Sequence, residues 1–303
     1  MEYPIQPLSS SWRPRLWLHA LLFSLTVFTT TAVGSRMAFN FHHNLPAFDI
    51  EHDLNVFIQA FRDPSILLAG LPYALTLLLI LTAHEFGHWF ACLYHEIDAS
   101  LPYFLPSPLV TGTFGAFIRF RSAVKSRREL FDVGVAGPIA GFIVAIPAVG
   151  IGLALSRVSP GLDQLSDIHF GTPALMRALQ WWLFPGVPAE DIYLHPVARA
   201  AWMGLFATGF NLLPVGQLDG GHLVYACFGD RHRQVSLVAI VLLCLTGIVT
   251  FHWPWIAWAA ILFFLGRRHF VVYGDGALGS GRMRLFLASA VIFALSFMPV
   301  PIR

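Results

Sequence analysis

Long apolar runs with few charges alternate with short polar segments along the chain. Four of these runs are clear, and they cover residues 16–34, 65–94, 133–155 and 200–228. A helix rises about 1.5 Å per residue, so about 20 apolar residues cross the hydrocarbon core of a bilayer. Each run therefore predicts a transmembrane helix, with an interruption near Pro214 in the fourth. The first run also fits a cleaved signal peptide, although its length favours a retained helix.

Two further runs lie toward the C-terminus. Residues 235–266 are longer than one span requires, and His252-Trp253-Pro254-Trp255 interrupts them. Proline stops a helix and tryptophan favours the membrane interface, so we predict a helical hairpin with a short second arm. The last run, 285–300, is short for a span. The expected fold class is an all-α polytopic membrane protein with six or seven transmembrane helices.

The segment between the second and third runs has a different composition. Pro102 and Pro106 exclude a long helix there, whereas residues 112–121 combine glycines with residues that favour strands. This pattern predicts a small membrane-associated β-hairpin. Its edge could pair with an unwound substrate strand, or the hairpin could plug the mouth of a site, and the sequence favours neither.

The composition agrees with a membrane protein. Hydrophobic residues make up 56% of the 303 residues and charged residues only 12%, about half the charged share of soluble proteins. The net charge of +2 and the absence of a basic face argue against nucleic-acid binding. The three cysteines form no CxxC pair, so we expect no structural disulfide. We predict a single membrane domain over 1–303, with its core in 65–229 and additional helices in 235–303.

Loop charges predict the orientation, because short cytoplasmic loops carry the lysines and arginines. With a cytoplasmic N-terminus, the inside segments hold Arg13, Arg15, Arg119, Arg121, Lys125, Arg127, Arg128, Arg231, Arg233, Arg267, Arg268, Arg282 and Arg284. The opposite loops hold the acids Glu51, Asp53, Asp63, Asp163, Asp167, Glu190 and Asp191. The signs alternate as the helical layout requires. One helix over 235–266 would break this alternation, which further favours the hairpin.

The second run ends in His84-Glu85-Phe86-Gly87-His88. On a helix His84 and His88 lie one turn apart on the same side, and Glu85 projects beside them. Two imidazoles suit zinc, which keeps an open position for a water and lowers the pKa of that water to near neutrality. Glu85 would accept the proton. Alternatively, the two histidines and Glu85 could be core residues that bind no metal, but burying an unpaired glutamate within a membrane is energetically costly.

A third metal ligand is expected from residues 211–222, which read NLLPVGQLDGGH. Pro214 and Gly216 should unwind the fourth span, which is tolerated where the backbone lines a cavity. Asp219 then falls at about the depth of His84, near the cytoplasmic side, and completes a site for one zinc ion. Asn211 could polarise a substrate carbonyl, or it could make a helix-helix hydrogen bond.

Other residues near these motifs have simpler interpretations. Cys92 continues the face of His84 and His88, but a fourth protein ligand would close the site to water. His222 could bind the metal, although a local hydrogen bond is the simpler expectation. Gly134, Gly137 and Gly141 have a spacing that lets helices approach closely, which predicts packing rather than chemistry.

Four motifs in this order resemble the site-2 protease family of intramembrane zinc metalloproteases, peptidase family M50. They are HEFGH, GTFGAF, FDVGVAGPIAG and NLLPVGQLDGGH, and the likeness covers about residues 71–229. The resemblance implies that His84, His88 and Asp219 bind zinc, that Glu85 activates water and that Asn211 assists. No insert long enough for a PDZ domain is present, so the pattern is similar to the PDZ-lacking bacterial and plastid members.

The resemblance implies hydrolysis of peptide bonds in a membrane-spanning protein substrate, with the lipid bilayer as surroundings. We expect a bacterial plasma membrane, with the site toward the cytoplasm; the oligomeric state stays open. Membrane desaturases also use histidines, but they need several histidine boxes and this chain has one. A catalytically inactive zinc-binding homologue, acting as a binding or chaperone-like protein, is the main alternative.

Overall fold

The computed structural model describes residues 16–48, 58, 63–109, 111–265, 272 and 278–302. The predicted loop charges Arg13, Arg15, Glu51, Asp53, Arg267 and Arg268 lie outside the described residues. The helices are α1 (Leu16–His43), α3 (Pro64–Leu68), α4 (Leu71–Tyr94), α5 (Arg127–Ala154), α6 (Ala174–Leu183), α7 (Pro196–Asn211), α8 (Asp219–Phe228), α9 (His232–Val249), α10 (Trp253–Leu265) and α11 (Gly279–Ser296). Short elements are η1 (Asp163–Leu165), η2 (Ala189–Asp191), η3 (Gly229–Arg231), β1 (Tyr103–Pro106), β2 (Thr113–Phe117), β3 (Arg157–Val158) and β4 (Ile192–Tyr193).

The chain is a mostly helical membrane protein. Four helical segments in the described part of the chain are long and apolar enough to cross a bilayer: Leu16–His43, Pro64–Tyr94, Arg127–Ala154 and Asp219–Val249. The first three contain or overlap the predicted runs. The fourth differs, because it groups α8, η3 and α9 across a turn at Gly229, where φ is 56°, whereas α7 is a separate helix of 16 residues. Four spans follow from length and composition, and the predicted total of six or seven is not established.

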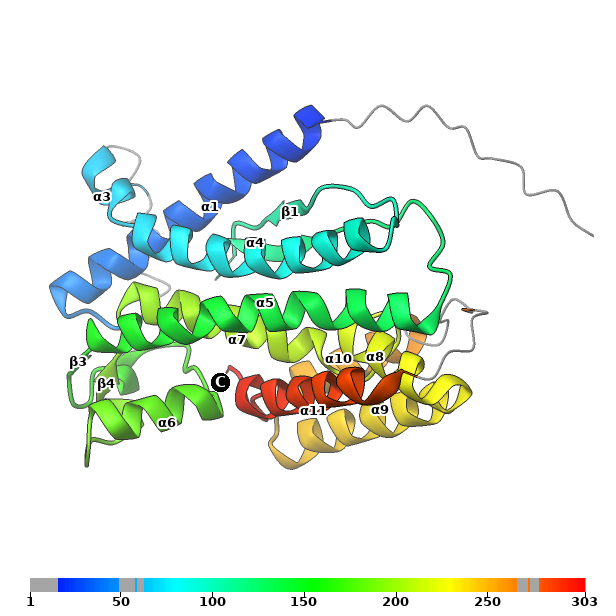
Figure 1. The fold of residues 1–303 in the computed structure, drawn as a ribbon. Helices are drawn as coiled ribbons and strands as arrows, with labels where there is room; N and C mark the ends of the chain where they lie inside the picture. Colours follow the sequence, from blue (N-terminus) through cyan, green and yellow to red (C-terminus); the bar gives the residue numbers. More distant parts are fainter. Residues whose placement is uncertain are drawn as a thin grey trace, which may run out of the picture.

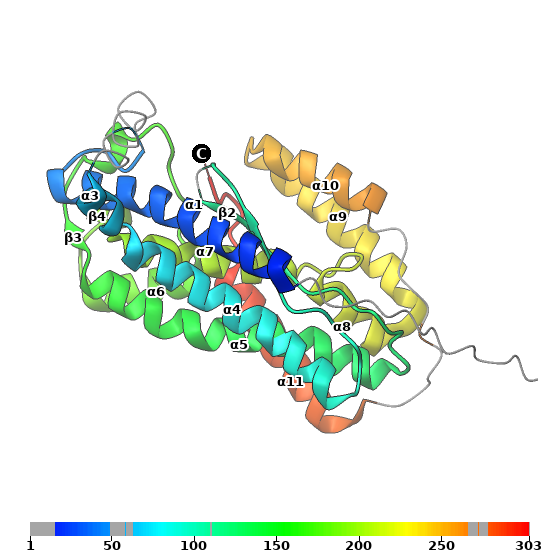
Figure 2. The same cartoon turned by 90° about the horizontal axis from the view of Figure 1, so that it is seen from above.

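Two predicted interruptions are confirmed. The helical backbone stops after Asn211 and resumes at Asp219, on either side of Pro214. The run 235–266 divides into α9 and α10 at the predicted proline segment, where Phe251 takes a positive φ of 53°. A helix tolerates proline only in its first turn, and Pro254 lies in the first turn of α10. In Figures 1 and 2 the α9–α10 pair lies beside the rest of the bundle.

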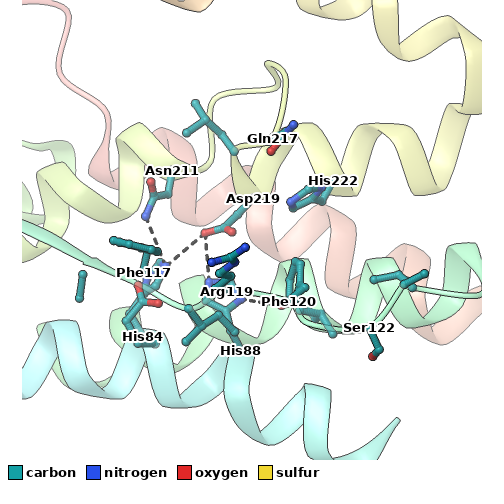
Figure 3. Close-up of a pocket in the computed structure, with 18 residues that line it drawn as sticks. His84, His88, Phe117, Arg119, Phe120, Ser122, Asn211, Gln217, Asp219 and His222 are labelled. Atoms are coloured by element: carbon teal, nitrogen blue, oxygen red, sulfur yellow. Dashed lines mark hydrogen bonds and ion pairs between the residues drawn. The ribbon is translucent and has the colours of Figure 1, made fainter. Parts of the chain in front are cut away.

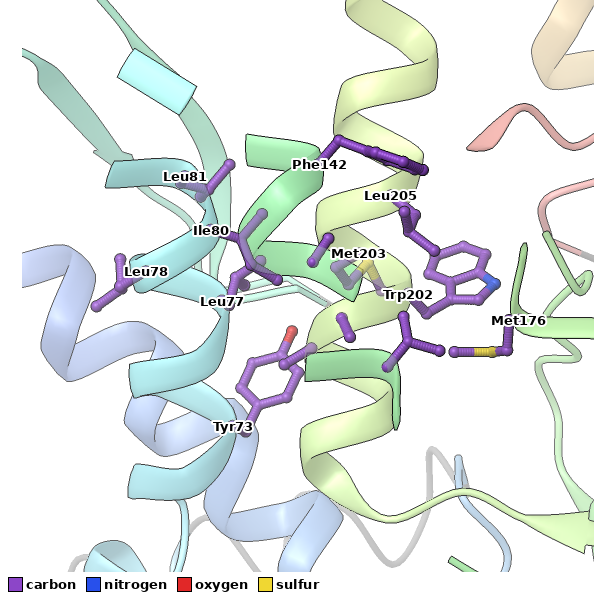
Figure 4. Packing of buried hydrophobic residues seen from close by; sticks show 14 of the residues in the cluster. Tyr73, Leu77, Leu78, Ile80, Leu81, Phe142, Met176, Trp202, Met203 and Leu205 are labelled. Atoms are coloured by element: carbon purple, nitrogen blue, oxygen red, sulfur yellow. The ribbon is translucent and has the colours of Figure 1, made fainter. Parts of the chain in front are cut away.

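Helix α5 is the centre of the bundle and packs against α4, α7 and α8. The start of α5, the end of α8 and the start of α11 lie at one end of the molecule (Figure 1), and β3, β4 and α6 lie at the other. The basic segments at residues 127–128, 231–233 and 282–284 therefore lie at one end. The core between α4 and α7 contains Tyr73, Leu77, Trp202 and Leu205, all at most 2% exposed (Figure 4).

The predicted β-hairpin is confirmed. Strands β1 and β2 pair antiparallel, from Tyr103 opposite Phe117 to Pro106 opposite Thr113, with a bulge at Pro106. The turn is fixed to two helices, because Thr29 of α1 donates to the carbonyl of Gly112 at 2.7 Å and Tyr73 of α4 donates to that of Thr111 at 2.9 Å. These bonds lay the hairpin along α1 and α4, so that the chain after β2 reaches the end of α4.

Close helix packing around α5 gives a first testable prediction. A Cβ on Gly152 would lie 2.4 Å from the backbone nitrogen of Ala198 in α7, whereas a Cβ on Gly150 meets nothing within 4 Å. Gly152→Ala should therefore destabilise the protein by about 1–3 kcal/mol through overpacking. Gly150→Ala, in the same helix, should leave stability unchanged or raise it. Thermal unfolding in detergent checks this; equal melting temperatures would contradict the close α5–α7 contact.

Candidate metal centre

Three predicted ligand residues come together where α4 meets the start of α8. The ligand atoms of His84, His88 and Asp219 all lie within 4.8 Å of one another. Nε2 of His84 lies 3.1 Å from Oδ2 of Asp219, and Nε2 of His88 lies 3.4 Å from the same oxygen (Figure 3). Both histidines are buried, and the Asp219 side chain is only 14% exposed. One ion could therefore contact all three residues.

The histidines are oriented by their neighbours. Helical spacing places the two rings on one side of α4, with centroids 4.9 Å apart. Nδ1 of His88 lies 2.7 Å from the carbonyl oxygen of Val133 in α5. A carbonyl only accepts, so Nδ1 carries the proton and Nε2 presents its lone pair to the site. This is the arrangement that metal-binding histidines generally have.

Asp219 reaches the histidines because the chain leaves the helix and then folds back tightly. Gly216 has a φ of 57°, which favours glycine. A Cβ on Gly220 would lie 2.0 Å from the carbonyl oxygen of Leu212, and one on Gly221 would lie 2.4 Å from that of Gly216. Ser236 of α9 donates to the carbonyl of Pro214 at 3.0 Å. The two glycines after Asp219 therefore allow the turn that brings its carboxylate into the site.

The donor set fits zinc. Imidazole nitrogens and a carboxylate oxygen are ordinary zinc ligands, and three protein ligands leave one tetrahedral position open. Ligand atoms about 2.0–2.1 Å from a tetrahedral ion lie about 3.3 Å apart. The distances of 3.1 Å and 3.4 Å between the imidazoles and Asp219 agree with that spacing. Without a cation, this group would bury a carboxylate against two imidazoles in an apolar region.

Glu85 and Asn211 lie at the same centre. Glu85 is buried and lines the cavity beside the histidines, together with Ile118, which comes just after β2. The amide nitrogen of Asn211, at the end of α7, lies 3.4 Å from Nε2 of His84 (Figure 3). The structure therefore brings all five predicted site residues together.

Cys92 and His222 stand apart from the three ligands. Cys92 is buried in a separate apolar cluster with Ile97, Leu130 and Val133. His222 is buried in the wall of the cavity, one turn into α8. Neither belongs to the metal-ligand group found in the described part of the chain.

Two cavities meet at the centre. One, of about 630 Å³, is lined on its polar side by Arg119, Ser122, Gln217 and His222. The other, of about 460 Å³, runs between α4, the β-hairpin and α7, with apolar residues such as Leu77, Ile80, Phe206 and Trp258 in its walls. His84, Glu85, Ala116 and Asn211 line both. The candidate centre is thus reached from a polar side and from an apolar side.

Comparison with known proteins agrees with this geometry. The model of peptidase family M50 matches residues 72–252, well over half of the chain. The chain belongs to peptidase family M50. The family match confirms the resemblance found in the sequence motifs, and it contains α4, the β-hairpin, α5, α7, α8 and α9.

M50 relatives named as plant proteases are similar to this chain. "Probable zinc metalloprotease EGY1, chloroplastic" of Oryza sativa subsp. japonica is 32% identical over 71% of this chain and 38% of that protein. "Probable zinc metalloprotease EGY2, chloroplastic" of Arabidopsis thaliana is 31% identical over 85% of this chain and 47% of that protein. The chain spans less than half the length of these relatives. Their chloroplastic names do not fit the expectation of a bacterial plasma membrane.

The sequence did not reveal two contributors to this M50 site. The carbonyl of Val133 orients His88, and no side-chain pattern marks a backbone group. The glycines of α5 were expected to serve packing, and the structure shows that they pack on the ligands: a Cβ on Gly137 would lie 2.1 Å from Nε2 of His88. A Cβ on Gly141 would lie 3.1 Å from Cβ of His84. The spacing of these glycines in the sequence was the feature from which this contact could have been predicted.

Gly137 gives a second prediction. Gly137→Ala should displace the His88 ring and weaken zinc binding by at least about tenfold, the scale of changes that disturb ligand orientation. Gly150→Ala, in the same helix but facing open space, is the matched control and should bind as the wild type does. Competition with a chromogenic chelator measures the affinity. Wild-type affinity in Gly137→Ala would contradict the close packing of α5 on His88.

Proposed function

We propose that the chain is a zinc metalloendopeptidase of the site-2 protease type, which hydrolyses peptide bonds within or near membrane-spanning segments of other proteins. One zinc ion per chain would be held by His84, His88 and Asp219. The observation that carries the proposal is the position of Glu85: a buried carboxylate beside a complete set of zinc ligands, in a helix apolar enough to cross a membrane.

The residues of the chain have separable roles in this reaction. A bound zinc ion would supply Lewis-acid chemistry, polarising the substrate carbonyl and making a water more acidic. Glu85 accepts the proton of the attacking water and then delivers it to the departing amine nitrogen. Glu85 lines the cavity beside the histidine ligands, so its carboxylate is close to where that water would bind. Base and ligands are thus fixed before substrate arrives.

Asn211 would stabilise the carbonyl oxygen as it becomes negative. Its amide nitrogen lies 3.4 Å from Nε2 of His84. Nε2 has a single lone pair, so once it binds a metal it no longer accepts from the amide. The Asn211 N–H is then available to donate to the substrate carbonyl oxygen.

The apolar cavity supports a membrane-spanning substrate. A segment that enters between α4 and α7 stays among mostly apolar side chains until it reaches His84 and Glu85. Carbonyl groups of an intact helix are occupied by hydrogen bonds, so the segment must unwind before it is cut. Phe114, Gly115 and Ala116 of β2 line this cavity, where the edge of the strand could pair with the unwound chain.

The membrane and the orientation also belong to the proposal. The basic loops at one end of the bundle favour a site toward the cytoplasm or the equivalent compartment. The proposal does not extend to the bacterial plasma membrane, because the relatives compared above are named as chloroplastic. An inactive zinc-binding homologue would keep the ligands but would not need Glu85.

The Glu85→Gln variant therefore distinguishes an active protease from an inactive zinc-binding protein. Purified protein in liposomes should cleave a reporter with one membrane-spanning segment, and Glu85→Gln should lower the rate by at least about 10²-fold by removing the base. The variant should retain zinc, because Glu85 is not a ligand. A chelator should abolish wild-type cleavage, and added zinc should restore it.

The contrary results are clear. Full activity in Glu85→Gln would contradict the proposed mechanism. Zinc binding by the wild type without cleavage of any membrane-spanning reporter would favour the inactive homologue.

Asn211 provides a further prediction. Asn211→Ala should lower kcat by about 10²-fold, the usual cost of losing one donor to a developing oxyanion. KM and the melting temperature should stay near wild type. Thr246→Val in α9, which removes a hydroxyl that bonds the carbonyl of Leu242 and lies outside both cavities, is the control. A loss of stability with unchanged kcat would instead assign Asn211 to helix packing.

A further inference from the structure

A cluster of three polar side chains lies close to the metal centre without touching it. Asp132 of α5 receives two hydrogen bonds from Arg282 of α11, Nε to Oδ1 at 2.8 Å and Nη2 to Oδ2 at 2.6 Å. Nε2 of His95, the capping residue just after α4, lies 2.9 Å from Oδ2 of the same carboxylate. Asp132 therefore joins three helices at a single carboxylate.

This cluster is connected to His88 in two ways. Asp132 precedes Val133, whose carbonyl oxygen accepts the hydrogen bond from Nδ1 of His88 at 2.7 Å. His95 follows His88 on α4 by two helical turns. The contact of His95 with Asp132 therefore fixes the spacing of α4 and α5 next to the bond that orients the ligand. A shift of α5 along α4 would break both interactions together.

The geometry makes this contact strong and directional. A two-point arginine–carboxylate pair fixes both the distance and the plane of the carboxylate, which a lysine cannot do. The side chains are 22% exposed for Asp132, 16% for His95 and 30% for Arg282, so water screens them only in part. Such a pair resists sliding between helices better than apolar contacts do, because apolar contacts have no preferred direction.

Arg282 lies beyond the part of the chain that the family model matches, which ends at residue 252. Helix α11 nonetheless packs along α5 and α7, which support the site. In Figure 1, α11 runs beside α5 with its start at the end of the molecule where α5 begins. The C-terminal helix is therefore placed to act on the centre through α5.

We propose that Arg282 is a positioning residue for the metal centre, acting through Asp132 to hold the Val133 carbonyl against His88. This inference rests on the proposed zinc site. Loss of the pair would let the start of α5 move, so that Nδ1 of His88 loses its acceptor and Nε2 loses its fixed direction. The effect should appear in metal binding before any substrate is present.

The test measures zinc affinity on the full chain in detergent, by competition with a chromogenic chelator. Arg282→Gln should weaken binding by about tenfold, at the low end of the usual 10–100-fold cost of removing an outer partner of a ligand. Arg284→Gln, which changes an exposed arginine two residues later in α11, is the matched control and should bind as the wild type does. The absorption spectrum of the cobalt-substituted protein should change in Arg282→Gln alone.

The results separate this inference from the proposed function. A folded Arg282→Gln variant that binds zinc within twofold of the wild type, with an unchanged cobalt spectrum, overturns the positioning role even if its melting temperature falls. If Arg282→Gln does not fold, Asp132→Asn decides, because it keeps the side-chain volume and weakens both contacts; wild-type affinity there overturns the role equally. Absence of zinc binding by the wild type would overturn the proposed function and this role together.

Discussion

Asp219 places a carboxylate oxygen 3.1 Å and 3.4 Å from two imidazoles that α4 buries among apolar helices. Burying a carboxylate in such surroundings is unfavourable unless it is paired, and the pairing requires α8 to begin at the side of α4. Much of the remaining architecture serves this contact. The glycines of α5 make room for the rings, and the break between α7 and α8 brings the aspartate to them.

Close packing is the second constraint, because the ligands come from helices that must approach almost to backbone contact. Gly137 lies under His88, and Gly152, four turns along α5, lies against the backbone of Ala198 in α7. Helices in a membrane gain little from hydrophobic association, so small residues that allow close van der Waals packing carry more of the stability. The residues that hold the bundle together thus also position the site.

The sequence predicted features that depend on local pattern and missed those that depend on tertiary contact. The HExxH spacing placed His84 and His88 together, and Pro214, Pro254 and the glycine-rich segment after Pro106 marked the two helix breaks and the β-hairpin. The grouping of the later helices was not predictable in this way: the sequence predicts one span over 200–228, whereas the fourth apolar helical stretch covers Asp219–Val249 and turns at Gly229. Composition alone does not show that the polar segment 229–234, between two apolar stretches, is itself helical.

The break after Asn211 explains how two residues distant on a helix can serve one atom. In an unbroken helix Asn211 and Asp219 would be separated by about 12 Å along the axis. Here both lie near Nε2 of His84, at 3.4 Å for the Asn211 amide and 3.1 Å for the Asp219 carboxylate. The unwound loop shortens that separation and places Asp219 in the first turn of α8, where the helix dipole favours a negative charge. Backbone hydrogen bonds within the loop and the bond from Ser236 to the Pro214 carbonyl satisfy part of its polar backbone. Gln217 and Leu218 line a cavity, where irregular backbone is tolerated. The same break therefore builds the ligand set and opens the space in which a substrate could meet it.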